Sequence, residues 1–153
     1  MSIWTHVAGI IRIDAWPGID PEPDFDEIIG RECLYESDDI VWKEMSNHPD
    51  CFLPKGSEGT LQKSVWINPY PSAARYTVSV FGDLRDHYSP NEIIRWFEKV
   101  CKRINDLGYW IRNAIITAEN ELNGCRSWVL NREFEDVCVL DECDEEGEGR
   151  EYD

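Results

Sequence analysis

The stretch from Ser89 to Gly108 constrains the fold of this 153-residue chain more than any other. It opens with the letters SPNE, in which Ser89 provides an N-cap, Pro90 takes the first helical position and Glu92 completes a capping box. Apolar residues then recur at helical spacing as far as Ile104, and Gly108 follows as a C-cap. The sequence therefore predicts one long amphipathic helix, whose apolar side needs a surface to pack against.

Strands predicted on both sides of this helix supply that surface. Alternating apolar and polar residues predict strands over residues 3–16, 61–68, 75–82, 109–120 and 125–132, and a short edge strand within 134–140. With short helices at Asp24 or Asp26 and over 38–47, this order predicts an α+β fold. We expect a ferredoxin-like βαββαβ antiparallel sheet with helices on one face and an added C-terminal hairpin strand. One domain would cover residues 1–140, followed by an acidic disordered tail over 141–153.

The chain is strongly acidic, with a formal net charge of −16. Residues 14–58 contain 13 acidic and 3 basic residues and residues 133–153 contain 11 and 1, so each block carries −10. The centre, residues 59–132, carries +3. This balance argues against direct binding to a nucleic-acid backbone, which needs a basic surface. It favours a partner protein with a basic surface.

Targeting and cofactor signals are absent from the sequence. The opening MSIWTHVAGIIRIDAW has no basic region and carries Arg12 and Asp14 inside its apolar run, unlike a signal peptide. No apolar run reaches the roughly 20 residues of a membrane span. We therefore expect a cytoplasmic protein with no membrane partner, whose 6 Cys are free thiols. We expect no cofactor, because no P-loop, G-x-G-x-x-G, G-x-S-x-G or H-E-x-x-H motif occurs.

The run FGDLRDHYSPNE, directly before the helix, gathers residue types found at functional sites. A helix N-terminus binds anions, so Arg85, His87 and Ser89 predict a small-ligand or nucleotide site. Asp83, Asp86 and His87 are metal-type ligands, which predicts a metal-dependent enzyme as a second alternative. The third interpretation is a strand-to-helix connector whose charged residues pair locally.

Two other groups of residues have the chemistry of a site. One His and three Cys form a zinc-type ligand set, without the usual tight spacing: His48, Cys51, Cys138 and Cys143. His6 and Asp14 share one face of the first strand. At 3.3 Å per residue they lie about 26 Å apart, so they cannot form an acid–base pair. Arg12 is expected to pair with Asp14 instead.

The acidic block over residues 14–58 is the predicted partner-binding surface, because a folded segment holds carboxylates at fixed spacing. The predicted contacts are its acidic residues and one Trp on the basic side of the helix: Asp20, Glu22, Asp24, Asp26, Glu27, Glu36, Asp38, Asp39 and Trp96. Trp is a frequent interface anchor, and we expect Trp96 to be exposed. Other Trp residues, with Arg12 or Arg112, are an alternative interaction surface. Exposed aromatic residues and hairpin edges are also compatible with a homodimer.

The segments WTHVAGIIRID and YTVSVFGDLRD resemble a group of small uncharacterised acidic proteins carried by tailed phages and prophages. The resemblance spans residues 3–130 and contains no catalytic signature. The group has no function to transfer, but small acidic phage proteins of one domain commonly act by binding. The resemblance thus implies a non-enzymatic protein in the cytoplasm of a bacterial host. It would inhibit or modulate a host defence protein through an acidic surface, for example by nucleic-acid mimicry toward a nuclease.

Overall fold

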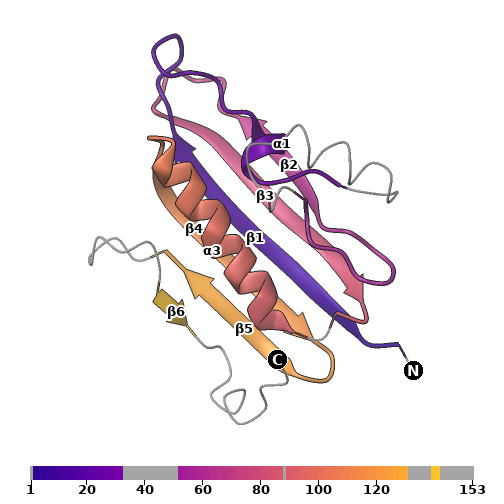
Figure 1. Ribbon diagram of the computed structural model, residues 1–153. Helices are drawn as coiled ribbons and strands as arrows, with labels where there is room; N and C mark the ends of the chain where they lie inside the picture. Colours follow the sequence, from indigo (N-terminus) through magenta and orange to yellow (C-terminus); the bar gives the residue numbers. More distant parts are fainter. Residues whose placement is uncertain (1, 33–51, 88, 131–138, 142–153) are drawn as a thin grey trace.

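The computed structural model describes residues 2–32, 52–87, 89–130 and 139–141, and within these ranges it has an α+β fold (Figure 1). The strands are β1 (Trp4–Asp14), β2 (Gln62–Ile67), β3 (Ala74–Arg85), β4 (Trp110–Asn120), β5 (Gly124–Val129) and β6 (Val139–Asp141). They form one sheet in the order β2-β3-β1-β4-β5-β6, in which all neighbours are antiparallel. The helices are α1 (Phe25–Ile28) and α3 (Pro90–Asp106). The predicted α+β class is confirmed.

Alternation along β1 decides which face of the sheet carries the core. Val7, Ile11 and Ile13 are buried, whereas His6 and Arg12 are exposed on the opposite side of the strand. The same alternation continues through β3 and β4. Helix α3 lies across the buried face (Figure 1). The sheet therefore has a helix-covered face, which carries the core, and an opposite face, called the open face below.

Helix α3 begins and ends as its sequence predicts. Ser89 is the N-cap, and its Oγ accepts a hydrogen bond of 3.3 Å from the Glu92 backbone N–H. Gly108 follows the helix with a φ of +91°, a conformation that glycine adopts without steric cost. The ring of Phe97 packs edge-on against Trp128 of β5, with ring centroids 5.4 Å apart. The cap thus fixes the start of α3, and the contact with Trp128 anchors the helix to β5.

Trp96 is buried, so the expectation of an exposed partner-binding Trp on α3 is wrong. Only 8% of Trp96 is exposed, and its ring lies 6.3 Å from that of Phe97. At 100° per residue, Trp96 lies about 100° around the helix from Phe97 and about 40° beyond Val100, so it extends one edge of the apolar stripe. Burial removes the large apolar area of the indole ring from water, which stabilises the buried position of Trp96.

Helix α1 is short and is fixed at both ends. The side chain of Asp24 caps its start by accepting the backbone N–H groups of Asp26 and Glu27 at 3.1 and 3.2 Å. Arg103 of α3 donates to the carbonyl of Ile28 at 2.9 Å, which ties the two helices together. The sequence offered Asp24 or Asp26 as the start of this helix, and in the structure Asp24 is the N-cap. The helix predicted over residues 38–47 lies outside the described residues.

Strand β3 continues to Arg85, three residues beyond its predicted end. The loop after β1 and α1 supplies the reason, because Ser57 N–H donates to the Arg85 carbonyl at 2.8 Å and Arg85 N–H donates to the Glu58 carbonyl at 3.0 Å. Asp83 and Arg85 are therefore strand residues, not loop residues. The connection to α3 starts only at Asp86.

The β4–β5 turn is longer than the two-residue hairpin turn that an Asn-Gly pair such as Asn123 and Gly124 usually indicates. Asn120 pairs with Gly124 at the end of the hairpin, so three residues lie between them. The Asn120 Oδ1 accepts the backbone N–H groups of Leu122 and Asn123 at 2.9 and 2.8 Å. Strand β6 confirms an edge strand near residues 134–140, beside β5. In the part of the chain that the structure describes, no helix has the length and apolar character needed to cross a membrane.

Candidate functional site

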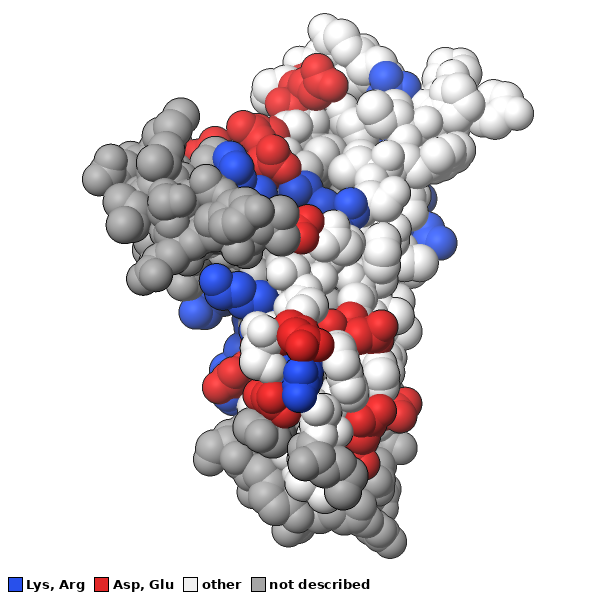
Figure 2. Space-filling view, turned by 90° about the vertical axis from the view of Figure 1, so that its right-hand side faces the viewer, with Lys and Arg blue, Asp and Glu red and all other residues white. Residues whose placement is uncertain are grey.

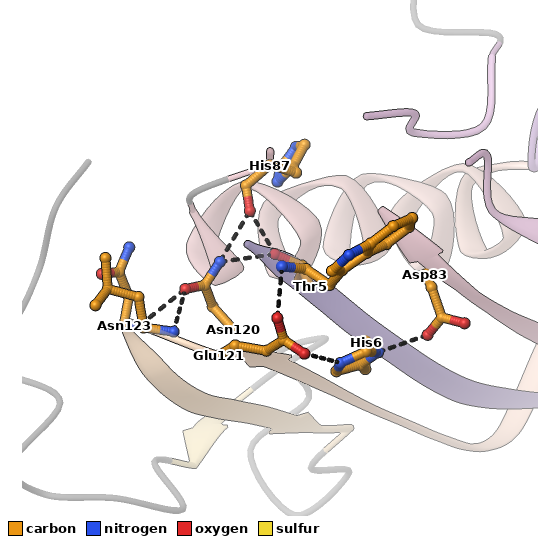
Figure 3. Close-up of polar contacts among 9 residues, drawn as sticks. Thr5, His6, Asp83, His87, Asn120, Glu121 and Asn123 are labelled. Carbon is orange, nitrogen blue, oxygen red and sulfur yellow. Dashed lines mark hydrogen bonds and ion pairs between the residues drawn. The ribbon is translucent and has the colours of Figure 1, made fainter. Parts of the chain in front are cut away.

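The open face carries a charged cluster that joins three chain segments (Figure 3). The imidazole of His6, on β1, lies between two carboxylates (Figure 3). Its Nδ1 is 2.6 Å from Asp83 Oδ1 on β3, and its Nε2 is 3.1 Å from Glu121 Oε2 in the β4–β5 turn. Glu121 Oε1 also accepts the backbone N–H of Trp4 at 3.0 Å. We call His6, Asp83 and Glu121 the His6 cluster.

The His6 cluster favours the charged forms of His6 and Glu121. Hydrogen bonds to Asp83 and then to Glu121 raise the pKa of His6 above its ordinary value. The hydrogen bond from His6 and the one from the Trp4 backbone lower the pKa of Glu121. Both ring nitrogens are engaged by carboxylates, so neither is positioned to take a proton from a substrate. The cluster is an ionic clamp across the sheet.

A buried network behind the His6 cluster holds the connector before α3 (Figure 3). The carbonyl of His87 accepts the Thr5 hydroxyl, and also the Asn120 Nδ2–H at 3.0 Å. Asn120 Nδ2 donates to Thr5 Oγ1 as well, at 2.9 Å. Thr5 and Asn120 are both buried, so these bonds satisfy polar groups inside the fold. The position of the connector is thus set by β1 and β4.

The residues predicted for an anion site are each engaged locally. Arg85 Nη1 lies 2.7 Å from a Glu58 carboxylate oxygen. His87 Nε2 lies 3.3 Å from a Glu92 carboxylate oxygen, and burial lowers the pKa of His87 below its ordinary value. Ser89 caps the helix. Local pairing of this kind is what the connector interpretation predicts.

The residues predicted for a metal site also have separate partners. Asp83 binds His6, and the Asp86 carboxylate accepts the Ser57 hydroxyl at 2.9 Å. His87 faces Glu92. Within the described ranges, no group of three or more His, Cys, Asp or Glu residues is arranged to hold a metal ion. The zinc-type set lies outside the described residues: His48, Cys51, Cys138 and Cys143.

Several of the predicted partner-binding carboxylates take part in internal contacts. Asp24 caps α1, Asp26 binds Lys63 on β2 at 2.6 Å, and Asp20 Oδ2 accepts the Trp16 backbone N–H at 2.6 Å. Glu27 lies in the first turn of α1. Three further predicted residues lie outside the described ranges: Glu36, Asp38 and Asp39.

A depression of about 170 Å³ lies where the chain leaves β1. We call it the Trp16 pocket. It is lined by Ala15, Trp16, Pro17, Gly18, Asp20, Glu22, Ile67, Arg75 and Tyr76. Trp16 is 55% exposed, and the carboxylate of Glu22 forms no hydrogen bond or ion pair with a described residue. Arg75 also lines the pocket, and its Nη1 donates to the Asn68 carbonyl at 2.8 Å.

The Trp16 pocket is lined by two aromatic residues, two acidic residues and one Arg. An indole face and nearby carboxylates together stabilise a bound ammonium or guanidinium group. The loop is held in place by the Tyr109 hydroxyl, which donates to the Pro21 carbonyl at 2.7 Å. The sequence singled out Asp20 and Glu22, but it offered Trp16 only as one of several Trp residues of an alternative interaction surface. The signal was an aromatic residue directly before the acidic, proline-rich run PGIDPEP.

Apolar side chains form a continuous band across the open face. In the sheet register, Ala8 lies beside Phe81, and Ile10 lies beside Ile115, which in turn lies beside Val129. Phe81, Ile115 and Val129 are 45%, 42% and 38% exposed. Exposed apolar patches of this kind mark interaction surfaces. We call these five residues the apolar band.

The negative charge is unevenly divided between the described residues and the rest. The described residues include 12 Lys and Arg and 16 Asp and Glu, so they contribute −4 to the net charge of −16. On the face shown in Figure 2, Asp and Glu form separate groups with Lys and Arg between them. A continuous acidic surface is not visible among the described residues on that face.

Comparisons of the chain with protein-family models, with curated proteins and with solved structures found no match. No relative therefore assigns a role to the Trp16 pocket, the His6 cluster or the apolar band. The resemblance to phage proteins stays a prediction from the sequence.

Proposed function

We propose that this chain acts by binding a protein with a basic surface, and that it inhibits or modulates that protein as a phage-type factor acting on a host protein. The observation that carries the proposal is the Trp16 pocket, in which two of the predicted partner-binding residues, Asp20 and Glu22, lie beside an exposed indole. The pocket would take a Lys or Arg side chain of the partner.

The size and chemistry of the pocket support this partner class. A volume of about 170 Å³ suits one long basic side chain rather than a larger ligand. The indole of Trp16 offers a cation–π contact, and Glu22, which lines the pocket, offers an ion pair. The net charge of −16 would speed the encounter with a basic partner.

Mimicry of nucleic acid is not part of the proposal. Mimicry needs a row of carboxylates held at the spacing of phosphates. Among the described residues, Asp24 and Asp26 are used in a helix cap and an ion pair. Charges of both signs also alternate on the face in Figure 2. These observations favour recognition of single basic side chains.

No second function is proposed for the connector before α3. A nucleotide site there would need Arg85 to be available, and Arg85 is paired with Glu58. A metal-dependent reaction would need Asp83, Asp86 and His87 to converge, and each binds a different residue.

We also propose that β1 to β4, with α1 and α3, form a ferredoxin-like unit. Each βαβ pair is split by one strand in the sheet order: β3 lies between β1 and β2, and β1 lies between β3 and β4. This is the split βαβ arrangement of that fold. Strands β5 and β6 extend the sheet beyond β4.

Capture from a bacterial lysate tests the proposed function. The bait proteins are the wild type, the double variant Trp16→Ala/Glu22→Gln, and Glu98→Gln, which makes the same charge change on α3 as Glu22→Gln. We expect the wild type and Glu98→Gln to enrich the same basic protein. The double variant should retain about one tenth of it or less, because it loses both the cation–π contact and the ion pair.

Two results would contradict the proposal. The first is the absence of any enriched basic protein at low or moderate salt. The second is equal enrichment by all three bait proteins, which would show that the Trp16 pocket takes no part in binding.

A further inference from the structure

Beyond the proposed function, the open face has the properties of an interface between two copies of this chain. Its apolar band crosses strands β3, β1, β4 and β5 on the side of the sheet opposite α3, and among the described residues Phe81, Ile115 and Val129 of this band are exposed. Burial of this band requires a second apolar surface. The charges at its two ends decide which surface fits.

One end of the open face is acidic. His6 lies between Asp83 and Glu119 in the register of β3, β1 and β4, and Glu121 follows in the turn. Asp83 and Glu121 bind His6, whereas Glu119 forms no hydrogen bond or ion pair with a described residue. Glu119 is thus a carboxylate at this end that has no partner among the described residues.

The other end is basic. Arg12 lies beside Asn113 in the register, and its one hydrogen bond among the described residues goes to the Asn113 side chain at 3.0 Å. Arg12 therefore lacks an ion-pair partner within the described ranges. Along β1, His6 and Arg12 are six residues apart, about 20 Å, with Ala8 and Ile10 of the apolar band between them.

We propose that two copies of the chain pack face to face through their open faces, about a two-fold axis that runs across the strands through the apolar band. The row of His6 and the row of Arg12 lie equally far from the middle of the band. The two-fold axis therefore brings Arg12 of each copy over the row of His6 in the other. There it meets Glu119 on β4 and Asp83 on β3, which flank β1 on both sides.

This arrangement satisfies both needs of the open face. Two packed sheets are about 10 Å apart, so the apolar bands interdigitate and leave water. The ion pair between Arg12 and Glu119 forms twice, once in each direction. A two-fold axis parallel to the strands would instead place the acidic end of one copy on the acidic end of the other. Repulsion between like charges disfavours that arrangement.

Molar mass in solution tests the proposed dimer. Light scattering after gel filtration should give the mass of two chains for the wild type. Arg12→Glu and Glu119→Arg should each weaken the dimer about tenfold or more in Kd, because each places like charges together twice in one interface. The double variant Arg12→Glu/Glu119→Arg restores opposite charges and should return to near the wild-type Kd.

An independent pair of variants addresses the apolar band. Ile115→Glu should give the mass of one chain, whereas the control Leu107→Glu, at an exposed site after α3, should remain dimeric. Circular dichroism checks that each variant is folded. A wild-type protein with the mass of one chain at all concentrations overturns the proposal. So does a double variant Arg12→Glu/Glu119→Arg whose dimer is weakened by the sum of the effects of the two single variants. A dimer unaffected by Ile115→Glu overturns it as well.

Discussion

At the residue scale, His6 shows how one side chain links three segments of the chain. Its ring lies between Asp83 and Glu121, which are 77 and 115 residues away in the sequence. The ring also lies on the open face, where it is partly exposed, so solvent weakens each ion pair. The His6 cluster thus makes a small, pH-dependent contribution to stability.

The sign of this pH dependence follows from the two pKa shifts. The raised pKa of His6 means that its contribution is fully present below pH 6.5 and is lost as the pH rises through the folded-state pKa. The lowered pKa of Glu121 means that its contribution is present above pH 4.5 and is lost as the pH falls through the folded-state pKa. We expect the Tm difference between the wild type and His6→Gln to be largest between these values, in thermal unfolding at a series of pH values.

His87 provides a control of opposite sign. Burial lowers its pKa, so the wild type loses stability as the pH falls below 6.5, and His87→Gln should relieve this loss. A Tm difference for His6→Gln that does not change with pH, or that follows the trend of His87→Gln, would show that the His6 cluster is not an ionic clamp.

The His6 cluster could not be predicted from the sequence, for a geometric reason. Spacing along β1 correctly separates His6 from Asp14, but the partners of His6 come from neighbouring strands. The identity of these partners depends on the register of β1 with β3 and β4. The alternation of residues along a single strand does not determine that register. For the same reason Asp14 pairs with Arg112 at 2.8 Å, and the expected pair with Arg12 is wrong.

At the element scale, periodicity and caps predicted the order of the strands and of the main helix. Ser89, Gly108 and Asp24 lie at the helix ends that their sequence context indicates. The end of β3 was missed because a loop distant in sequence pairs with Arg85. The burial of Trp96 was missed because the width of a buried stripe depends on what packs around the helix.

The loop that extends β3 depends on a glycine. Gly59 has a φ of +81°, and a Cβ there would lie 2.1 Å from the Asp83 carbonyl oxygen. Gly18 has nearly the same φ, +78°, but open space around it. We expect Gly18→Ala to cost about 1–2 kcal/mol from backbone strain alone. Gly59→Ala should cost about 3 kcal/mol or more, because the clash adds to the strain.

Urea unfolding of the wild type and these two variants measures the difference. The comparison isolates the contact between the loop and β3, because the two glycines have nearly the same φ. Equal losses of free energy of unfolding in the two variants would mean that the loop does not press against the end of β3.

At the scale of the whole molecule, charge and apolar surface are separated. Residues outside the described ranges carry −12 of the net charge of −16, while the described domain has a mixed surface. The apolar band lies on the open face, and the Trp16 pocket lies where β1 ends.

The central claim is that the Trp16 pocket binds basic side chains. The seven Trp indole N–H groups are separate reporters in a nitrogen–proton correlation spectrum, which can be recorded while an arginine-rich peptide is added. We predict that the Trp16 signal shifts with saturation and that the signals of the buried residues Trp96 and Trp128 do not. A Trp16 signal that stays in place, while other signals shift or none do, would contradict the claim.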